Sequence, residues 1–140
     1  GITVHAGEPN VPGAANNILV ALDELGADRI GHGVQAIQDD RVVTRLADDG
    51  IPLELCPWSN VLTRAVSSID AHPFKALMER GVRTTLNTDD PGVMDITMMD
   101  ECRHALGPLG LSMSELEHCN LWARDASFIP KERIDAVWPS

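Results

Sequence analysis

Short runs rich in apolar residues alternate with helical patterns four times along the chain. The runs stand at Ile2–Val4, Arg29–Ile30, Ile51–Leu55 and Val82–Leu86. Apolar residues with helical spacing follow each run, over Ala14–Leu25, Asp40–Asp49, Pro73–Arg80 and Met94–Leu106. Strands without polar alternation are typical of parallel sheets that helices cover. The pattern therefore predicts an α/β fold with four parallel strands.

Two further helices are expected after Gly110. Ser112 and Glu115 have the spacing of a capping box, which begins a helix that reaches about Ala123, and Pro130–Val137 indicates another. No linker-like composition divides the chain, so residues 1–140 are expected to form one unit. Two parent folds fit, a doubly wound sheet and a TIM-type (β/α)8 barrel. A complete barrel takes about 250 residues, so four units would make half of one.

The composition excludes several classes of protein. With 11 basic and 21 acidic residues the formal net charge is −10, which argues against nucleic-acid binding. No apolar run reaches the roughly 18 residues of a membrane span. Three cysteines without paired spacing favour reduced thiols in a cytoplasmic protein. The first residues resemble a strand rather than a signal peptide, and without an initiator methionine we expect the chain to begin inside a larger protein.

Chemically active side chains follow all four predicted strands. They are His5 with Glu8, then His32, then Cys56, and finally the pair Asp89 and Asp90. The C-terminal ends of parallel strands meet at one edge of a sheet, where functional groups collect. His5 and Glu8 reach the same site only if the chain bends at Gly7, which glycine permits. The sequence therefore predicts a site at this edge.

Each of these residues also has a purely structural interpretation. One histidine at a strand end is more often hydrogen-bonded within the fold than a ligand, and Glu8 fits a solvated loop. Asp90 before Pro91 fits a helix cap. The remaining histidines and cysteines are given no role: His72, His104 and His118 are expected on the surface or on helices, Cys56 as a packed thiol near the site, and Cys102 and Cys119 on helices.

Taken together, the strand-end residues favour metal-assisted hydrolysis. Two adjacent carboxylates repel each other, and burying one without a partner costs several kcal/mol, so a cation would compensate the pair. Histidine and aspartate ligands suit zinc, which makes water reactive near neutral pH. A second histidine beside the metal can act as a base, and a nearby glutamate can act as an acid.

Four motifs together resemble the adenosine deaminase family. They are His-Ala-Gly-Glu at His5–Glu8, Arg-Ile-Gly-His-Gly at Arg29–Gly33, Cys-Pro-Trp-Ser-Asn at Cys56–Asn60, and Leu-Asn-Thr-Asp-Asp-Pro at Leu86–Pro91. They stand in the family's order, and the resemblance extends over nearly the whole chain. The family is a zinc-dependent eight-fold barrel that hydrolyses adenosine to inosine and ammonia, with one zinc ion in each complete active site.

The resemblance implies a role for each strand-end residue. His5 and Asp89 would be zinc ligands. Glu8 would protonate the purine ring nitrogen beside the attacked carbon. His32 would take the proton of the attacking water and steady the resulting charge.

The resemblance further implies a purine nucleoside as substrate. Asp90 would accept a hydrogen bond from a purine nitrogen, and Gly7 would also contribute to substrate binding. Related deaminases act on adenine, on AMP derivatives or on aminodeoxyfutalosine, so these substrates remain alternatives.

The chain also departs from the family pattern. The family's first strand carries a His-x-His pair that supplies two more zinc ligands, and no His-x-His occurs in these 140 residues. The resemblance therefore covers the C-terminal half of the barrel, with the N-terminal half as a missing partner. The isolated chain is expected to be inactive, and to be unstable, oligomeric or accompanied by that half. An alternative of another class is an inactive half-barrel or an interaction module.

Overall fold

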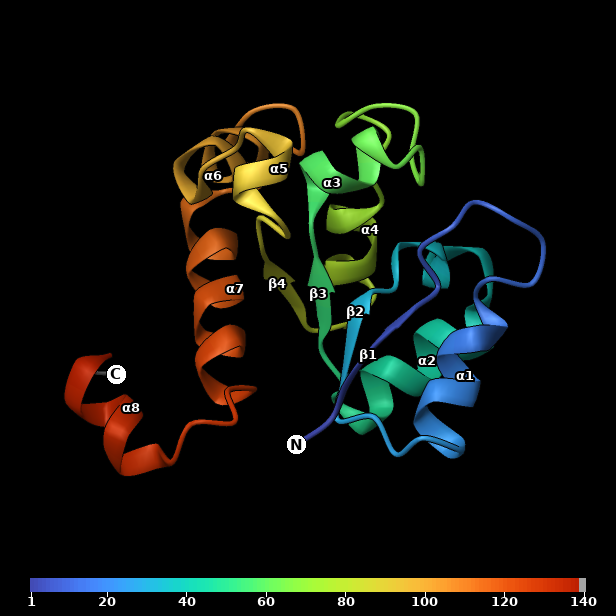
Figure 1. Ribbon diagram of the computed structural model, residues 1–140, viewed down its shortest axis with the longest axis horizontal. Helices are drawn as coiled ribbons and strands as arrows, with labels where there is room; N and C mark the ends of the chain where they lie inside the picture. Colours follow the sequence, from blue (N-terminus) through green and yellow to red (C-terminus); the bar gives the residue numbers. More distant parts are fainter. Residues whose placement is uncertain (139–140) are drawn as a thin grey trace.

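Four parallel strands form a single sheet in the computed structural model, which describes residues 1–138 (Figure 1). The strands are β1 (Thr3–Ala6), β2 (Arg29–His32), β3 (Leu53–Leu55) and β4 (Thr84–Leu86). Their order in the sheet is β1-β2-β3-β4, and every neighbouring pair is parallel. A doubly wound sheet reverses its strand order at a switch point, whereas a barrel adds each strand beside the previous one. The sequential order confirms the half-barrel prediction.

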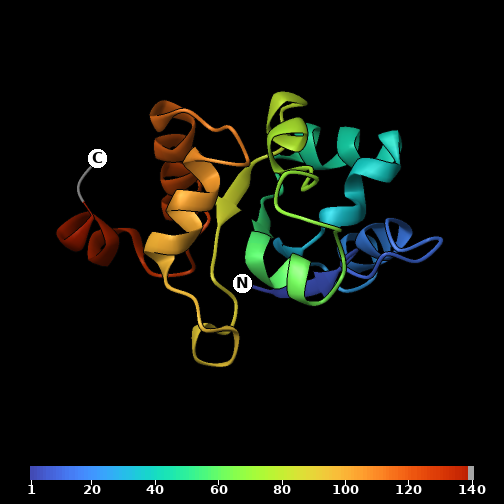
Figure 2. The same ribbon diagram turned by 90° about the horizontal axis from the view of Figure 1, so that it is seen from above.

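Helices cover one side of this sheet. Between the strands lie α1 (Asn16–Asp23), the 3₁₀ helix η1 (Val34–Gln38), α2 (Asp40–Asp49), α3 (Pro57–Leu62) and α4 (Phe74–Glu79). After β4 come α5 (Pro91–Met94), α6 (Met98–Leu106), α7 (Met113–Asp125) and α8 (Lys131–Val137). Seen from above, α1, α2, α4 and α7 follow the sheet in an arc (Figure 2). This arrangement matches the outer helical layer of a barrel.

The core lies between the sheet and this arc of helices. Its largest fully buried apolar side chains include Ile18, Ile30, Leu46, Leu53, Leu55, Phe74, Leu77 and Val82. They come from the runs and helical faces that the sequence pattern marks as apolar. No helix within residues 1–138 is long and apolar enough to cross a membrane.

Two predicted helical regions differ from the structure. The helix expected over Met94–Leu106 begins later, at Met98, because Asp95 adopts a left-handed conformation (φ 48°) that ends the separate short helix α5 at Met94. A capping box between Thr97 and Asp100 then begins α6. The second difference is that neither η1 nor α3 was predicted. The helix α3 begins two residues after the end of β3 with Pro57 in its first turn, a position where proline is favoured.

The two outer strands of the sheet lack a second strand partner. Within the described residues, β1 pairs only with β2, and β4 pairs only with β3. Unpaired strand edges promote association with other chains. We refer below to this chain together with a segment that supplies the remaining strands as the assembled barrel.

We expect the purified 140-residue chain to self-associate or to lose cooperative unfolding, because both sheet edges are open. Sedimentation velocity combined with denaturant unfolding measures both properties. Adding the segment that supplies the remaining strands should restore a single species and a cooperative transition. A stable, cooperatively folded monomer of these residues alone contradicts the expectation.

Candidate active site

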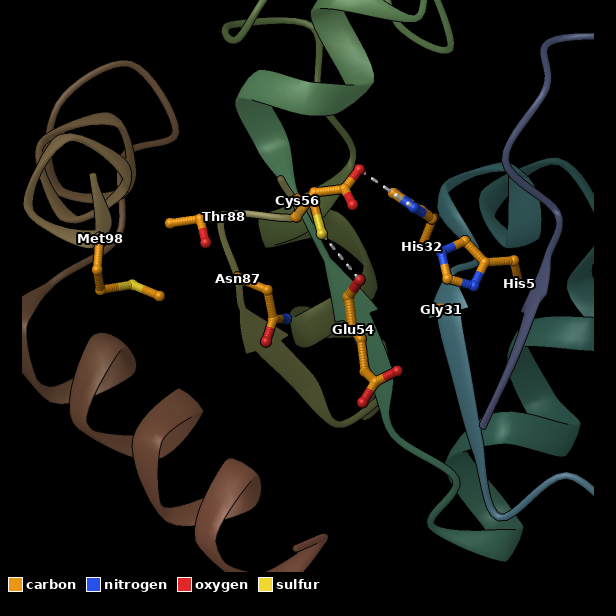
Figure 3. A pocket seen from close by; sticks show the side chains of 9 residues that line it. His5, Gly31, His32, Glu54, Cys56, Asn87, Thr88 and Met98 are labelled. Carbon is orange, nitrogen blue, oxygen red and sulfur yellow. Dashed lines mark hydrogen bonds and ion pairs between the residues drawn. The ribbon is translucent and has the colours of Figure 1, made fainter. Parts of the chain in front are cut away.

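An open cleft of about 320 Å³ lies where the four strands end (Figure 3). Residues from all four strand ends line it, among them His5, His32, Cys56 and Asp89. The structure therefore brings together groups that are up to 84 positions apart in the sequence, from His5 to Asp89. This is the edge at which the sequence predicts a site.

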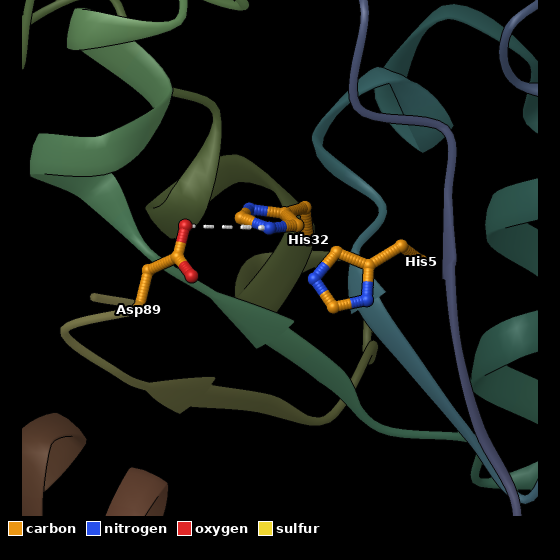
Figure 4. Close-up of side chains that lie close together, drawn as sticks. All are labelled: His5, His32 and Asp89. Atoms are coloured by element: carbon orange, nitrogen blue, oxygen red, sulfur yellow. Dashed lines mark ion pairs between the residues drawn. The ribbon is translucent and has the colours of Figure 1, made fainter.

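Three of these side chains form a cluster that suits a metal ion (Figure 4). One ligand atom each from His5, His32 and Asp89 lies within 4.8 Å of the other two. His32 is buried, whereas His5 and Asp89 are exposed to the cleft. Two imidazoles and a carboxylate are a donor set that zinc accepts. The residues present therefore fit the expected metal.

The pairing of β1 with β2 gives the His5 imidazole its space. His5 lies opposite Gly31 in the parallel register. A Cβ atom at Gly31 would stand 3.0 Å from Nδ1 of His5 and 3.3 Å from its Cε1. The absence of a side chain at Gly31 thus lets the imidazole lie across β2. No pattern along the sequence gives Gly31 this role, because the role depends on the residue beside it in the sheet.

His32 and Asp89 both turn the chain at the end of a strand. Their φ angles are 59° and 61°, in the left-handed region that residues other than glycine rarely adopt. Histidine and aspartate are among the side chains that tolerate this region best. Ser59 donates a hydrogen bond of 2.7 Å to Oδ2 of Asp89, which fixes the orientation of that carboxylate.

Glu8 reaches the same place through a bend after β1. Gly7 has a φ of 66°, and a Cβ atom there would stand only 2.6 Å from Ile18 Cδ1. The backbone amide of Gln35 donates to the Gly7 carbonyl at 2.8 Å and holds the bend. Thr63 Oγ1 then donates to Oε1 of Glu8 at 2.9 Å. Glu8 consequently lies beside His32, with Oε1 3.8 Å from Nδ1.

The helix α3 carries two polar side chains into the site, and the sequence marks both of them only as part of a motif. Ser59 and Asn60 are fully buried. Asn60 Nδ2 lies 3.0 Å from His32 Nδ1 and 3.3 Å from Glu8 Oε1. The available signal was a proline two residues after a predicted strand, with Ser59 and Asn60 following after Trp58.

The expectation for His72 is wrong. This residue was expected on the surface or on a helix, but it is 6% exposed in the turn before α4. Its Nε2 lies 3.1 Å from Asn60 Oδ1, so it belongs to the layer behind the site. Burial, together with the nearby His32, lowers the pKa of His72 to about 4. The other two histidines agree with the prediction, since His104 lies on α6 and His118 on α7.

Asp90 lies next to the cluster rather than within it. It occupies the N-cap position of α5, but within the described chain its side chain makes no capping hydrogen bond. The capping interpretation therefore explains its position in the backbone and leaves its exposed carboxylate available for another partner.

Burial dominates the electrostatics of the site. It lowers the pKa of His32, although the carboxylates of Glu8 and Asp89 act in the opposite direction. Burial also raises the pKa of the Cys56 thiol far above its usual range, so this residue stays a neutral packed thiol beside the cleft. Cys102 and Cys119 lie on α6 and α7, as predicted.

Comparisons with known proteins agree with this geometry. The family model described as adenosine deaminase matches residues 1–138. An adenosine deaminase from Escherichia coli (strain SE11) is 40% identical over 136 residues. That alignment covers 97% of this chain but 40% of the relative, so the chain spans less than half the length of the curated relatives it matches.

Solved structures show the same partial coverage. An adenine deaminase from Arthrobacter aurescens superposes with a TM-score of 0.88 at 33% identity, over 96% of this chain and 40% of that one. An Arabidopsis protein, ADAL, solved in complex with IMP, gives 0.81 at 35% identity, over 96% and 38%. An amidohydrolase from Burkholderia ambifaria with bound zinc shares the fold at a TM-score of 0.84 and 24% identity, over 97% and 38%.

Replacing Gly31 with alanine should weaken metal binding, because the new Cβ atom must push the His5 imidazole out of place. We expect roughly a tenfold loss of zinc affinity in the assembled barrel, the size of effect typical for residues that orient a ligand. Competition with a chromogenic chelator measures it. Gly92→Ala is the matched control, since a Cβ atom there meets no described atom within 4 Å. Equal affinities in the two variants would contradict the role of Gly31.

Proposed function

This chain belongs to the adenosine deaminase family, and we propose that it supplies the C-terminal half of a barrel that hydrolyses the exocyclic amine of a purine nucleoside. Adenosine is the substrate we favour, with inosine and ammonia as products. The observation that carries the proposal is the meeting of His5, His32 and Asp89 within 4.8 Å at the strand ends, with Glu8 beside them. The first barrel half would supply the remaining metal ligands and part of the substrate pocket.

We assign the metal site to His5 and Asp89. Their imidazole and carboxylate are the ligand types that zinc prefers, and both side chains face the cleft. Zinc, when bound, would lower the pKa of water so that it attacks carbon near neutral pH. Ser59 holds the Asp89 carboxylate, and Gly31 leaves room for the His5 imidazole.

The proposed proton chemistry belongs to His32 and Glu8. His32 faces the cluster with Nε2, which lies 3.8 Å from Asp89 Oδ2. From this position it would either take the proton of the attacking water or stabilise the charge that develops on its oxygen. Glu8 would donate a proton to the purine ring nitrogen as the water oxygen bonds to the neighbouring carbon. As the carbon–nitrogen bond breaks, the new hydroxyl group becomes a carbonyl and its proton passes to the amine, which leaves as ammonia. General acid or base catalysis of this kind contributes about 10²–10⁴-fold to a rate.

Substrate orientation is assigned to Asp90 and Gly7. The Asp90 carboxylate is exposed beside the cluster and can accept a hydrogen bond from a purine nitrogen. Gly7 would contribute through its backbone, because a Cβ atom there would meet the buried side chain of Ile18.

Other aminopurines remain candidate substrates within the same chemistry. The Arthrobacter relative is an adenine deaminase, and the Arabidopsis relative was solved with IMP, so the family accommodates a free base and a nucleotide. Aminodeoxyfutalosine is a further candidate. A panel of these compounds, followed by ultraviolet difference at the purine band, identifies the substrate by its relative kcat/KM.

A second candidate function is a non-catalytic half-barrel or interaction module. The absence of His-x-His from the sequence favours it for the chain by itself. Metal analysis of the assembled barrel discriminates the two functions. Near-stoichiometric zinc together with deaminase activity rules out the inert module, and a stable assembly without either supports it.

Glu8→Gln in the assembled barrel should reduce kcat at least about a hundredfold and leave the zinc content unchanged, because it removes the proton donor but not a ligand. Glu24→Gln, at an exposed position on the distant end of α1, is the matched control and should retain activity. Stopped assays with atomic-absorption measurement of zinc test both. Near-normal turnover or loss of zinc in Glu8→Gln would count against the acid assignment.

His32→Ala and Asp89→Ala should have different effects on the metal. We expect His32→Ala to keep zinc and lose most turnover, and Asp89→Ala to lose zinc, because only the second removes a proposed ligand. Zinc content after gel filtration separates the two effects. If His32→Ala also loses its zinc, His32 is a ligand and the division of roles proposed here is wrong.

A further inference from the structure

A buried series of hydrogen bonds leads from the first turn of α4 to the candidate catalytic residues. We infer that Asn60 and His72 are positioning residues, which together hold His32 as the tautomer that carries its hydrogen on Nε2. The same contact holds the carboxylate of Glu8 in place. This inference rests on the proposed function, because it states how the groups of that reaction are oriented.

The series begins at a group that can only donate. The backbone N–H of Phe74 lies 3.1 Å from Nδ1 of His72 and donates a hydrogen bond to it. Nδ1 must therefore carry no hydrogen, and the neutral imidazole carries its hydrogen on Nε2. Burial keeps His72 neutral near pH 7, since its pKa is lowered to about 4.

The hydrogen on His72 fixes the orientation of the Asn60 amide. Nε2 of His72 lies 3.1 Å from Oδ1 of Asn60, and this oxygen accepts the hydrogen bond. The NH₂ group of Asn60 must then point the other way. The reverse orientation would set two donors against each other at His72 and two oxygens against each other at Glu8. Hydrogen-bond networks of this kind decide how an amide is oriented.

The two hydrogens of the amide meet two acceptors. Nδ2 of Asn60 lies 3.0 Å from Nδ1 of His32 and 3.3 Å from Oε1 of Glu8. Because Nδ1 of His32 accepts, the neutral ring carries its hydrogen on Nε2. That nitrogen faces Asp89, with 3.8 Å between Nε2 and Oδ2. A nitrogen that carries hydrogen does not bind a metal ion, so His32 presents a donor to the cluster.

Burial makes this arrangement persistent. Asn60 is fully buried, and His32 and His72 are 2% and 6% exposed. Water therefore has little access to replace a lost partner, and each group depends on its neighbour. For His32 to accept a proton at Nε2, its hydrogen must first move to Nδ1, where the Asn60 amide opposes it. Of the two roles proposed for His32, the inferred tautomer therefore supports hydrogen bonding to the developing charge and opposes removal of the water's proton.

The first test observes the tautomer directly in the wild-type assembled barrel with zinc bound. Long-range ¹H–¹⁵N correlation of labelled histidines distinguishes a ring nitrogen that carries hydrogen from one that does not. His32 is assigned by the loss of its signals in His32→Ala. We expect hydrogen on Nε2 and none on Nδ1. A hydrogen on Nδ1, or a metal-bound Nε2, would overturn the inference whatever the activity.

The second test compares variants that keep volume but change hydrogen bonding. Asn60→Asp removes the donor with little change in shape, and we expect kcat to fall roughly 10–100-fold with KM little changed. It should also shift the His32 hydrogen toward Nδ1 in the same spectrum. His72→Gln keeps a donor toward Asn60 and should retain most activity, whereas His72→Leu should lose about as much as Asn60→Asp.

The controls separate positioning from folding and from the proposed reaction. His118→Gln changes an exposed histidine on α7 and should behave as wild type. Equal kcat in His72→Leu and His72→Gln, at equal unfolding free energy, would overturn the inference. If the assembled barrel shows the expected tautomer but deaminates no aminopurine, the proposed function fails while the positioning of His32 stands.

Discussion

The imidazole of His32 is buried between two carboxylates, and the arrangement of the other residues of the site depends on this placement. Glu8 Oε1 and Asp89 Oδ2 are each 3.8 Å from one of its two nitrogens. The three residues follow three different strands, so the arrangement exists only while β1, β2 and β4 keep their places in the sheet. Burial outweighs the two negative charges and lowers the pKa of the ring. The carboxylates therefore need hydrogen-bond donors from elsewhere.

Those donors come from α3, which begins where β3 ends. Ser59 donates to Asp89, and Thr63 donates to Glu8. The helix is itself anchored from the C-terminal part of the chain, because the fully buried carboxylate of Glu101 accepts the backbone N–H of Trp58 at 2.9 Å. A buried carboxylate at a helix N-terminus is favoured by the unpaired amides and by the helix dipole. The orientation of the site thus depends on contacts between α3 and α6 as well as on the sheet.

Sequence reasoning succeeded where the cause is local. Short apolar runs predicted the parallel strands, and polar residues directly after them predicted which side chains share an edge. It failed where the cause is a neighbour distant in sequence. Gly31 matters because His5 lies opposite it in the sheet, and His72 is buried because an irregular segment returns its ring to Asn60. Neither relation is visible before the strands are paired and the turn before α4 is folded.

The left-handed backbone at His32 and Asp89 lowers the stability of the fold at two residues that are proposed to take part in the reaction. A residue other than glycine held in this region costs on the order of 1 kcal/mol or more, and for Asp89 the exposed side chain returns little packing. Evolution under selection for thermal tolerance alone would favour Asp89→Gly, and a laboratory library screened only for soluble expression would drift the same way. An aspartate at this angle thus loses backbone stability and gains a carboxylate at the cleft, which is the kind of trade-off between stability and function that functional sites show.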